Sequence, residues 1–97
     1  MNPSEFLDMV KAALGLDTDY KVAKYFGLTP QAVGKWRQNI SYPDDKLLIE
    51  IARVTQIDIA VLLLHGAIWR GKQKATSQHW ERILSAYENE AENKRKD

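Results

Sequence analysis

The sequence contains no cysteine. A disulfide framework and a thiolate metal site are therefore excluded, and a reducing cytoplasm fits this composition. The two histidines, His65 and His79, are too far apart to form a ligand-spacing motif, so we expect no metal and no other cofactor. A Gly-rich phosphate loop, a Ser/His/Asp arrangement and a pair of acid/base carboxylates are also missing. We therefore expect that the chain is not an enzyme.

Long apolar runs are absent as well. No stretch approaches the roughly 18 apolar residues that cross a bilayer, and the acidic N-terminal segment lacks the pattern of a signal peptide. We expect a cytoplasmic protein with no membrane partner. Strand-like alternation does not occur either. Every apolar series recurs at three and four residues, which predicts an all-α fold.

Positive charge is scarce in total but concentrated along the chain. The formal net charge is only +1, whereas residues 21–42 carry four bases and no acid. The four bases are Lys21, Lys24, Lys35 and Arg37. Because nucleic acids are bound by local positive charge, this distribution favours a nucleic-acid surface within residues 21–42.

Turn and cap residues divide the chain into about six predicted helices. The first begins near Pro3 and stops at Gly15, a residue that tolerates a left-handed C-terminal cap. Its predicted buried face consists of Phe6, Met9, Val10, Ala13 and Leu14. The second helix starts from Thr18 as N-cap and ends at Gly27 after Phe26.

The third predicted helix opens at Thr29 as N-cap, with Pro30 as its first residue, and runs through Gln38. A fourth begins at Asp44 or Asp45, and a fifth follows Asp58. The fourth carries the apolar residues Leu47, Leu48, Ile51, Ala52 and Val54.

Residues 59–69 are apolar at nearly every position, which is more than a one-sided surface helix needs. This surplus predicts a second packing partner. A polar hinge at residues 71–77 precedes a C-terminal helix, and we expect a frayed tail from Asn89. The stripe of that helix consists of Trp80, Ile83, Leu84 and Tyr87. It packs either on its own domain or across a dimer, and the surplus in residues 59–69 favours the dimer.

The second and third helices are joined by only Gly27, Leu28 and Thr29, so they must cross steeply. Such a corner requires a small residue at the close approach, here Ala23, and a positive φ at Gly27. The residues expected to face inward are Val22, Phe26, Leu28, Val33 and Trp36. Trp36 continues the Val33 stripe, which favours a core role over a stacking platform. A plain helical corner with no ligand is the alternative, and the acid-free basic stretch argues against it.

Residues 19–38, DYKVAKYFGLTPQAVGKWRQ, resemble the helix-turn-helix of the phage Cro and CI repressor (XRE-type) superfamily, and residues 41–55 resemble its fourth helix. The resemblance covers about residues 3–64. It implies a five-helix, lambda-repressor-like domain at residues 1–70, followed by the hinge and C-terminal helix at 71–97. The size of the chain is similar to that of small phage or prophage regulators.

In that family the third helix enters the major groove while the second crosses the phosphate backbone. The resemblance places base contacts on the outward face of the third helix. These are Gln31, Lys35, Ala32 and Gly34. Phosphate contacts are implied for Tyr20, Lys21, Thr29, Arg37, Gln38, Asn39, Ser41 and Tyr42. Two positions depart from the pattern. Asp19 replaces a frequent phosphate-binding glutamine, and Pro30 replaces a residue that reads a base in some relatives.

One helix-turn-helix contacts few base pairs, so we expect a homodimer on a palindromic operator. The predicted dimer interface consists of Leu62, Leu64, Ile68, Trp69, Trp80, Ile83, Leu84 and Tyr87. The resulting hypothesis is a sequence-specific double-stranded DNA-binding transcription regulator, a dimeric repressor without a small-molecule ligand. An antitoxin-like interaction protein that autoregulates its operon, or an activator, remains an alternative.

Overall fold

The computed structural model describes residues 1–72 and 76–95, which form helices and contain no strand, as the apolar spacing predicts. The helices are α1 (Pro3–Leu14), α2 (Asp19–Tyr25), α3 (Pro30–Arg37), α4 (Asp45–Thr55), α5 (Ile59–Gly71) and α6 (Ser77–Arg95). The part of the predicted hinge at residues 73–75 lies outside the described residues. Within the described residues, no helix is long and apolar enough to cross a membrane.

Capping side chains fix where the helices begin. The Oγ1 atoms of Thr18 and Thr29 accept backbone hydrogen bonds inside α2 and α3, and Asp44 does the same for α4. Pro30 is the first residue of α3, and Gly15 ends α1 at φ +66°. These boundaries confirm the predicted caps. The start of α1 is a capping box between Asn2 and Glu5 that the sequence interpretation missed.

The core forms around Phe6, which is fully buried. The Phe6 ring meets Trp36 of α3 edge-on with centroids 6.3 Å apart, and it meets Tyr42 at 5.1 Å. Such aromatic pairs contribute about 0.5–1.5 kcal/mol beyond the area they bury. Ala13 is exposed, so its predicted burial is wrong. Leu14 and Leu16 cover this end of α1 instead.

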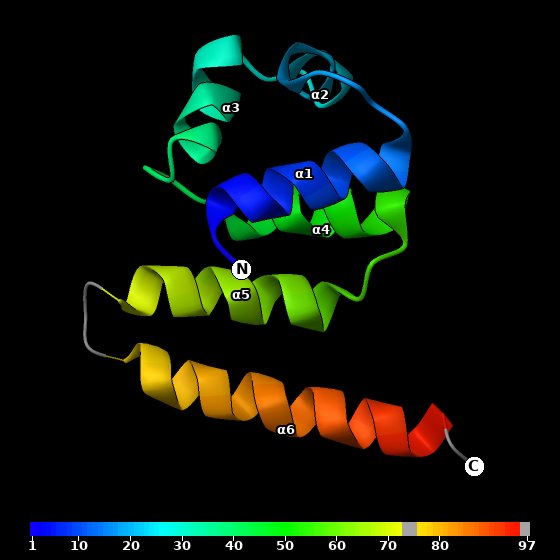
Figure 1. Ribbon diagram of the computed structural model, residues 1–97, viewed down its shortest axis with the longest axis vertical. Helices are drawn as coiled ribbons and strands as arrows, with labels where there is room; N and C mark the ends of the chain where they lie inside the picture. Colours follow the sequence, from blue (N-terminus) through cyan, green and yellow to red (C-terminus); the bar gives the residue numbers. More distant parts are fainter. Residues whose placement is uncertain (73–75, 96–97) are drawn as a thin grey trace.

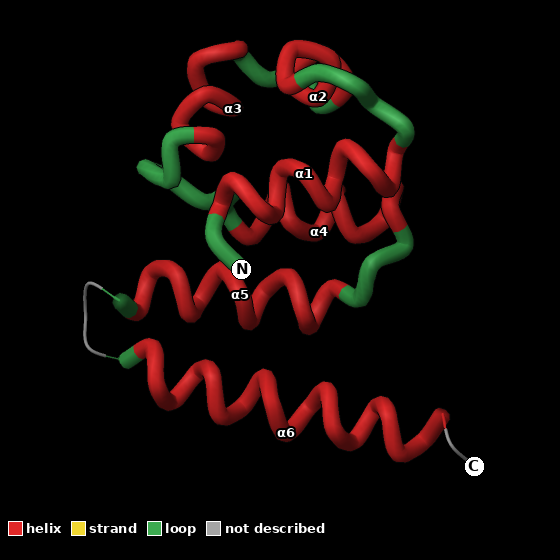
Figure 2. The backbone as a smooth tube through the Cα atoms, viewed as in Figure 1, coloured by secondary structure: helices red, strands yellow, loops and turns green. Residues whose placement is uncertain are grey.

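The molecule is a flat body of 39 × 35 × 19 Å, with α2 and α3 at one end and α6 at the other (Figure 1). Helices α1 and α4 occupy the middle, where α1 lies partly in front of α4 (Figure 1). Helices α4, α5 and α6 run across the long axis, as the tube view also shows (Figure 2). The α2–α3 end is thus held to the rest of the molecule mainly through α1.

The surplus of apolar residues in α5 is explained by two packing partners within one chain, α4 on one side and α6 on the other. Leu62 and Ile68 are buried, and α6 packs along α5. Leu84 of α6 is 7% exposed, and Tyr87 Oη donates a hydrogen bond to Asp58 at the start of α5. The Leu84 and Tyr87 side of the C-terminal stripe thus packs within the chain, whereas Trp80 and Ile83 are exposed, and pairing of two chains through the stripe stays a prediction.

Helix α6 continues past Asn89 through Arg95, and fraying of this end stays a prediction. Strong helix formers and an ion pair between Glu90 and Lys94, one turn apart, account for the extra turns. Gly71, the last residue of α5, lies close to the start of α6. A Cβ atom there would lie 2.7 Å from Thr76 Oγ1 and 3.0 Å from the backbone N of Ser77, so this close approach favours glycine.

Candidate nucleic-acid interface

The α2–α3 corner, residues 19–38, has the packing that the sequence predicts. Gly27 adopts φ +67°, a conformation that costs a residue with a Cβ atom about 1 kcal/mol. Val22 is fully buried, and Ala23 and Val33 are 1% exposed, so α3 is locked against α2. Two-turn helices such as these are unstable alone, and their position is set by this packing.

The outward face of α3, defined as Gln31, Ala32, Gly34 and Lys35, is open to solvent. Gln31 and Lys35 are exposed and lie one helical turn apart, whereas Ala32 and Gly34 are half-exposed between them. A Cβ atom at Gly34 would meet no atom within 4 Å. Within the described residues, Lys35 forms no ion pair. The four residues predicted to read bases therefore share one accessible surface.

Arg37 is not part of that surface. Its Nε and Nη2 atoms donate hydrogen bonds of 2.9 and 2.8 Å to the carboxylate of Asp19, and Nη2 also donates to Asp8 at 2.8 Å. A fourth bond runs from Nη1 to Ser4 Oγ at 2.8 Å. These donors tie the end of α3 to α1 and to the start of α2, and the phosphate contact predicted for Arg37 stays a prediction. Lys11 of α1 completes the network through a 3.1 Å ion pair with Asp19.

The charges in this network stabilise one another. The hydrogen bonds from Arg37, opposed by partial burial, hold the pKa of Asp19 at about 2, below its usual 3.8. The same contacts, with Asp19 first and Asp8 second, raise the pKa of Arg37 above its usual range. Asp19 therefore has a structural partner in Arg37.

Two other residues that were predicted to bind phosphate have contacts within the chain. Tyr42 is 9% exposed, and its buried hydroxyl has no hydrogen-bond partner among the described residues, so it is a core residue and its predicted phosphate contact is wrong. Burial raises the pKa of this hydroxyl. Asn39 uses its Oδ1 to accept the backbone N–H of Ser4 at 2.9 Å, which orients its side chain toward α1.

The other predicted phosphate ligands lie at or near the surface. Tyr20 is 63% exposed, and Gln38 is exposed at the end of α3. Lys21 pairs with Asp17 at 2.8 Å, but both side chains are more than half exposed, and such pairs contribute little. Thr29 accepts the Ala32 N–H and keeps its own hydroxyl hydrogen for another acceptor. Ser41 is half-buried.

Lys24 is a residue that the sequence interpretation counted in the basic stretch but did not place in the site. It is exposed on α2 and, within the described residues, forms no ion pair. With Arg37 neutralised by carboxylates and Lys21 facing Asp17, Lys24 and Lys35 are the unopposed cations of the corner. The sequence signal was present, because both belong to the acid-free stretch.

Several residues of the predicted dimer interface are unavailable. Leu62, Ile68 and Leu84 are buried within the chain, so their predicted role between two chains is contradicted. Trp69 packs against the core and is half-buried, and Tyr87 is half-buried beside Asp58.

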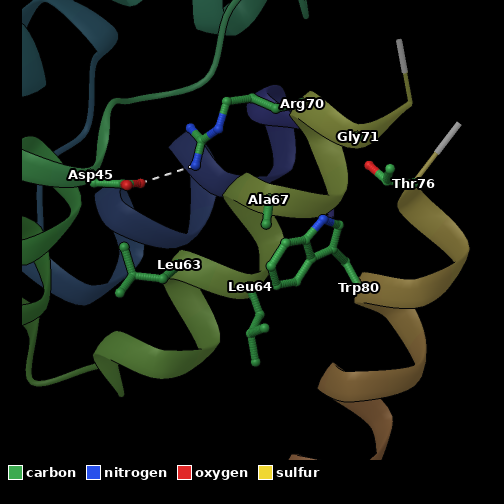
Figure 3. Close-up of a pocket in the computed structure, with 8 residues that line it drawn as sticks. All are labelled: Asp45, Leu63, Leu64, Ala67, Arg70, Gly71, Thr76 and Trp80. Atoms are coloured by element: carbon green, nitrogen blue, oxygen red, sulfur yellow. Dashed lines mark hydrogen bonds and ion pairs between the residues drawn. The ribbon is translucent and has the colours of Figure 1, made fainter. Parts of the chain in front are cut away.

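The remaining predicted interface residues lie at the α5–α6 end. Leu64 and Trp80 line an open groove of about 560 Å³, in which the indole ring lies over Ala67 (Figure 3). The Arg70–Asp45 ion pair closes its α4 side. Ile83 is 49% exposed on α6.

Comparison of the chain with protein-family models, with curated proteins and with solved structures gave no significant match.

Proposed function

We propose that the chain is a sequence-specific double-stranded DNA-binding transcription regulator of the helix-turn-helix type, which acts as a dimeric repressor of the kind found in phages. The observation that carries this proposal is the division of α3 into two faces. Val33 and Trp36 are buried, whereas Gln31 and Lys35 are exposed side by side. A helix held across its neighbour and displaying amide and ammonium groups fits the major groove.

The chemistry of the exposed pair supports base reading. The Gln31 amide can donate to and accept from adenine N6 and N7, and the Lys35 ammonium can donate to guanine O6 and N7. The half-exposed Ala32 lies beside Gln31 and offers a methyl group to thymine. The small Gly34 allows the helix backbone to approach the base edges.

Phosphate binding would come from a smaller set than the sequence indicated. Lys24 and Lys35 are exposed cations without an ion pair among the described residues, and Lys21 can exchange the exposed Asp17 for a phosphate at small cost. Tyr20 and Thr29 carry hydroxyl donors at the same end of the molecule. With so few cations per chain, a second subunit is needed for tight binding, and occlusion of a promoter is the simplest mechanism.

The proposal is tested by selecting duplexes from a random pool and measuring binding of the full chain by gel shift at fixed salt concentration. Gln31→Ala should relax discrimination at one base pair by about 1–3 kcal/mol. Lys24→Ala should weaken binding to all sequences alike and reduce the salt dependence. Arg82→Ala is the matched control, because it removes one exposed cation from α6 at the opposite end of the molecule.

Failure to enrich any sequence, together with equal affinity of the Gln31→Ala, Lys24→Ala and Arg82→Ala variants, would show that the outward face of α3 does not bind DNA.

A further inference from the structure

Ile40 is a large aliphatic side chain in the connection between α3 and α4. It lies three residues after the last residue of α3 and is 61% exposed. Exposed apolar surface is unfavourable in water, so an apolar group that covers Ile40 gains free energy.

The way in which α3 ends determines where Ile40 lies. Asn39 adopts φ +58°, a left-handed conformation that turns the chain back toward the helix. The Asn39 N–H donates to the Trp36 carbonyl at 3.0 Å, and the Ile40 N–H donates to the Lys35 carbonyl at 2.8 Å. These two hydrogen bonds form a Schellman motif, in which the side chain after the left-handed residue commonly packs toward the last turn of the helix. In α3 that turn contains Lys35 and Gly34, so Ile40 extends the outward face beyond the end of the helix.

The residues on both sides of Ile40 hold its backbone in place. Asn39 Oδ1 accepts the Ser4 N–H at 2.9 Å, which ties the connection to α1. On the other side, Tyr42 is buried against Phe6, with ring centroids 5.1 Å apart. Ile40 is thus an exposed side chain on a fixed backbone, and little conformational entropy is lost when it makes a contact.

We propose that Ile40 is a further specificity-determining residue, which contacts the C5-methyl group of a thymine in the major groove. An isoleucine side chain has no donor for a phosphate or for a base, and the thymine methyl is the apolar group that the major groove presents. The inference rests on the proposed function and deepens it, because it assigns a thymine to one operator position. This thymine differs from the one expected for Ala32, since Ala32 lies about 7.5 Å along the helix axis from the last residue of α3.

Deoxyuridine tests the contact, because it lacks only the methyl group of thymidine. Each thymine of the selected duplex is replaced in turn, and binding of the full chain is measured by gel shift at fixed salt concentration. For the wild type, loss of the contacted methyl group should weaken binding about 4-fold, the value of one buried methyl or methylene group. For Ile40→Ala, whose side chain does not reach that methyl group, the same replacement should leave binding unchanged.

The Ile40→Ala variant should bind the selected duplex about 10-fold more weakly than the wild type. Its salt dependence should stay the same, because no phosphate contact is lost. Its thermal melting should also match the wild type, since the side chain is exposed. Ile49→Ala is the matched control, because Ile49 is a 57% exposed isoleucine on α4 that does not belong to the outward face. This control should keep both the affinity of the wild type and its loss of binding with deoxyuridine.

The inference and the proposed function fail in different experiments. If binding to the selected duplex depends on Gln31, but every deoxyuridine weakens the wild type and Ile40→Ala equally, the thymine contact is wrong and DNA recognition stands. The thymine contact is also wrong if Ile40→Ala weakens selected and unrelated duplexes alike, the result expected for a contact with the sugar-phosphate backbone. If no duplex is selected and the Gln31→Ala, Lys24→Ala and Arg82→Ala variants bind equally, both proposals are wrong.

Discussion

The guanidinium of Arg37, the last residue of α3, forms a two-point ion pair with the carboxylate of Asp19, the first residue of α2, at 2.8 and 2.9 Å. Because the corner is short, the end of one helix returns beside the beginning of the other. The further bonds of Arg37 to Ser4 and Asp8 connect this pair to α1. The pair thus helps to fix the orientation of α3 relative to α1 and α2.

Arg37→Ala should lower the free energy of unfolding by about 1–2 kcal/mol, because it leaves Asp8 and Asp19 without their main donor. The guanidinium is 33% exposed, which keeps the loss below that of a fully buried pair. Urea unfolding measures this loss in the free energy of unfolding. Arg53→Ala is the control, since its pair with Glu50 is exposed and such pairs contribute little to stability. Equal midpoints for the two variants would show that the network does not stabilise the fold.

The pH dependence of stability should reveal Asp19. Its pKa is about 2 in the folded chain and 3.8 by reference, so its ionised form stabilises the fold above about pH 4. This contribution is lost as the pH falls through 2. Urea midpoints of the wild type should therefore decrease between pH 4 and pH 2 more steeply than those of Asp19→Asn. The remaining slope of Asp19→Asn comes from other carboxylates, among them Asp8, whose pKa is also lowered by Arg37. Parallel slopes for the two proteins would contradict the pairing.

Gly34→Ala should separate folding from recognition. A Cβ atom there meets no other atom within 4 Å, and the substitution removes a glycine from a helix interior. The free energy of unfolding should therefore rise by about 0.5–1 kcal/mol. The added methyl group on the outward face should weaken binding to the selected duplex. Thermal melting and gel shift measure the two effects. Gly66→Ala is the control, because its Cβ would lie 3.2 Å from Arg70 Nη2 and 3.3 Å from Leu48 Cδ1. This crowding should oppose the gain from removing a helix glycine, and the site on α5 is remote from α3. Unchanged DNA affinity of Gly34→Ala would show that the backbone does not approach the bases.

Leu84→Ala should release α6 without unfolding the rest of the chain. Leu84 is the buried side chain by which α6 is fixed on α5, and truncating a buried leucine costs about 2–5 kcal/mol. Amide hydrogen exchange of α6 should accelerate while that of α1 and α4 stays slow. Ile83→Ala, which truncates an exposed neighbour, should change neither. Uniform acceleration in all helices would indicate that α6 unfolds only together with the core.

Local chemistry made the helix boundaries predictable. Thr29 followed by Pro30 predicts the start of α3, and Gly27 predicts the turn, because caps and positive φ depend on residues adjacent in sequence. The apolar spacing likewise predicted the burial of Val33 and Trp36.

Contacts between residues distant in sequence were not predictable in this way. The sequence placed Arg37 in a basic surface because its partners Asp8 and Asp19 lie 29 and 18 residues away. The burial of Tyr42 follows from Phe6, which lies on another helix. The packing partner of α6 could not be predicted for the same reason, since the sequence pattern of a stripe such as Trp80 to Tyr87 is the same whether it packs within one chain or between two.

Helix α3 is only eight residues long, and the side chains that hold it are different from those that it displays. Val33 and Trp36 secure it from the inside, while Gln31 and Lys35 contribute nothing to the packing of the core. Substitutions of the two displayed residues by other good helix formers should therefore leave the core packing unchanged. If the outward face reads DNA, a new operator preference is accessible in two steps, and neither step passes through an unstable intermediate protein.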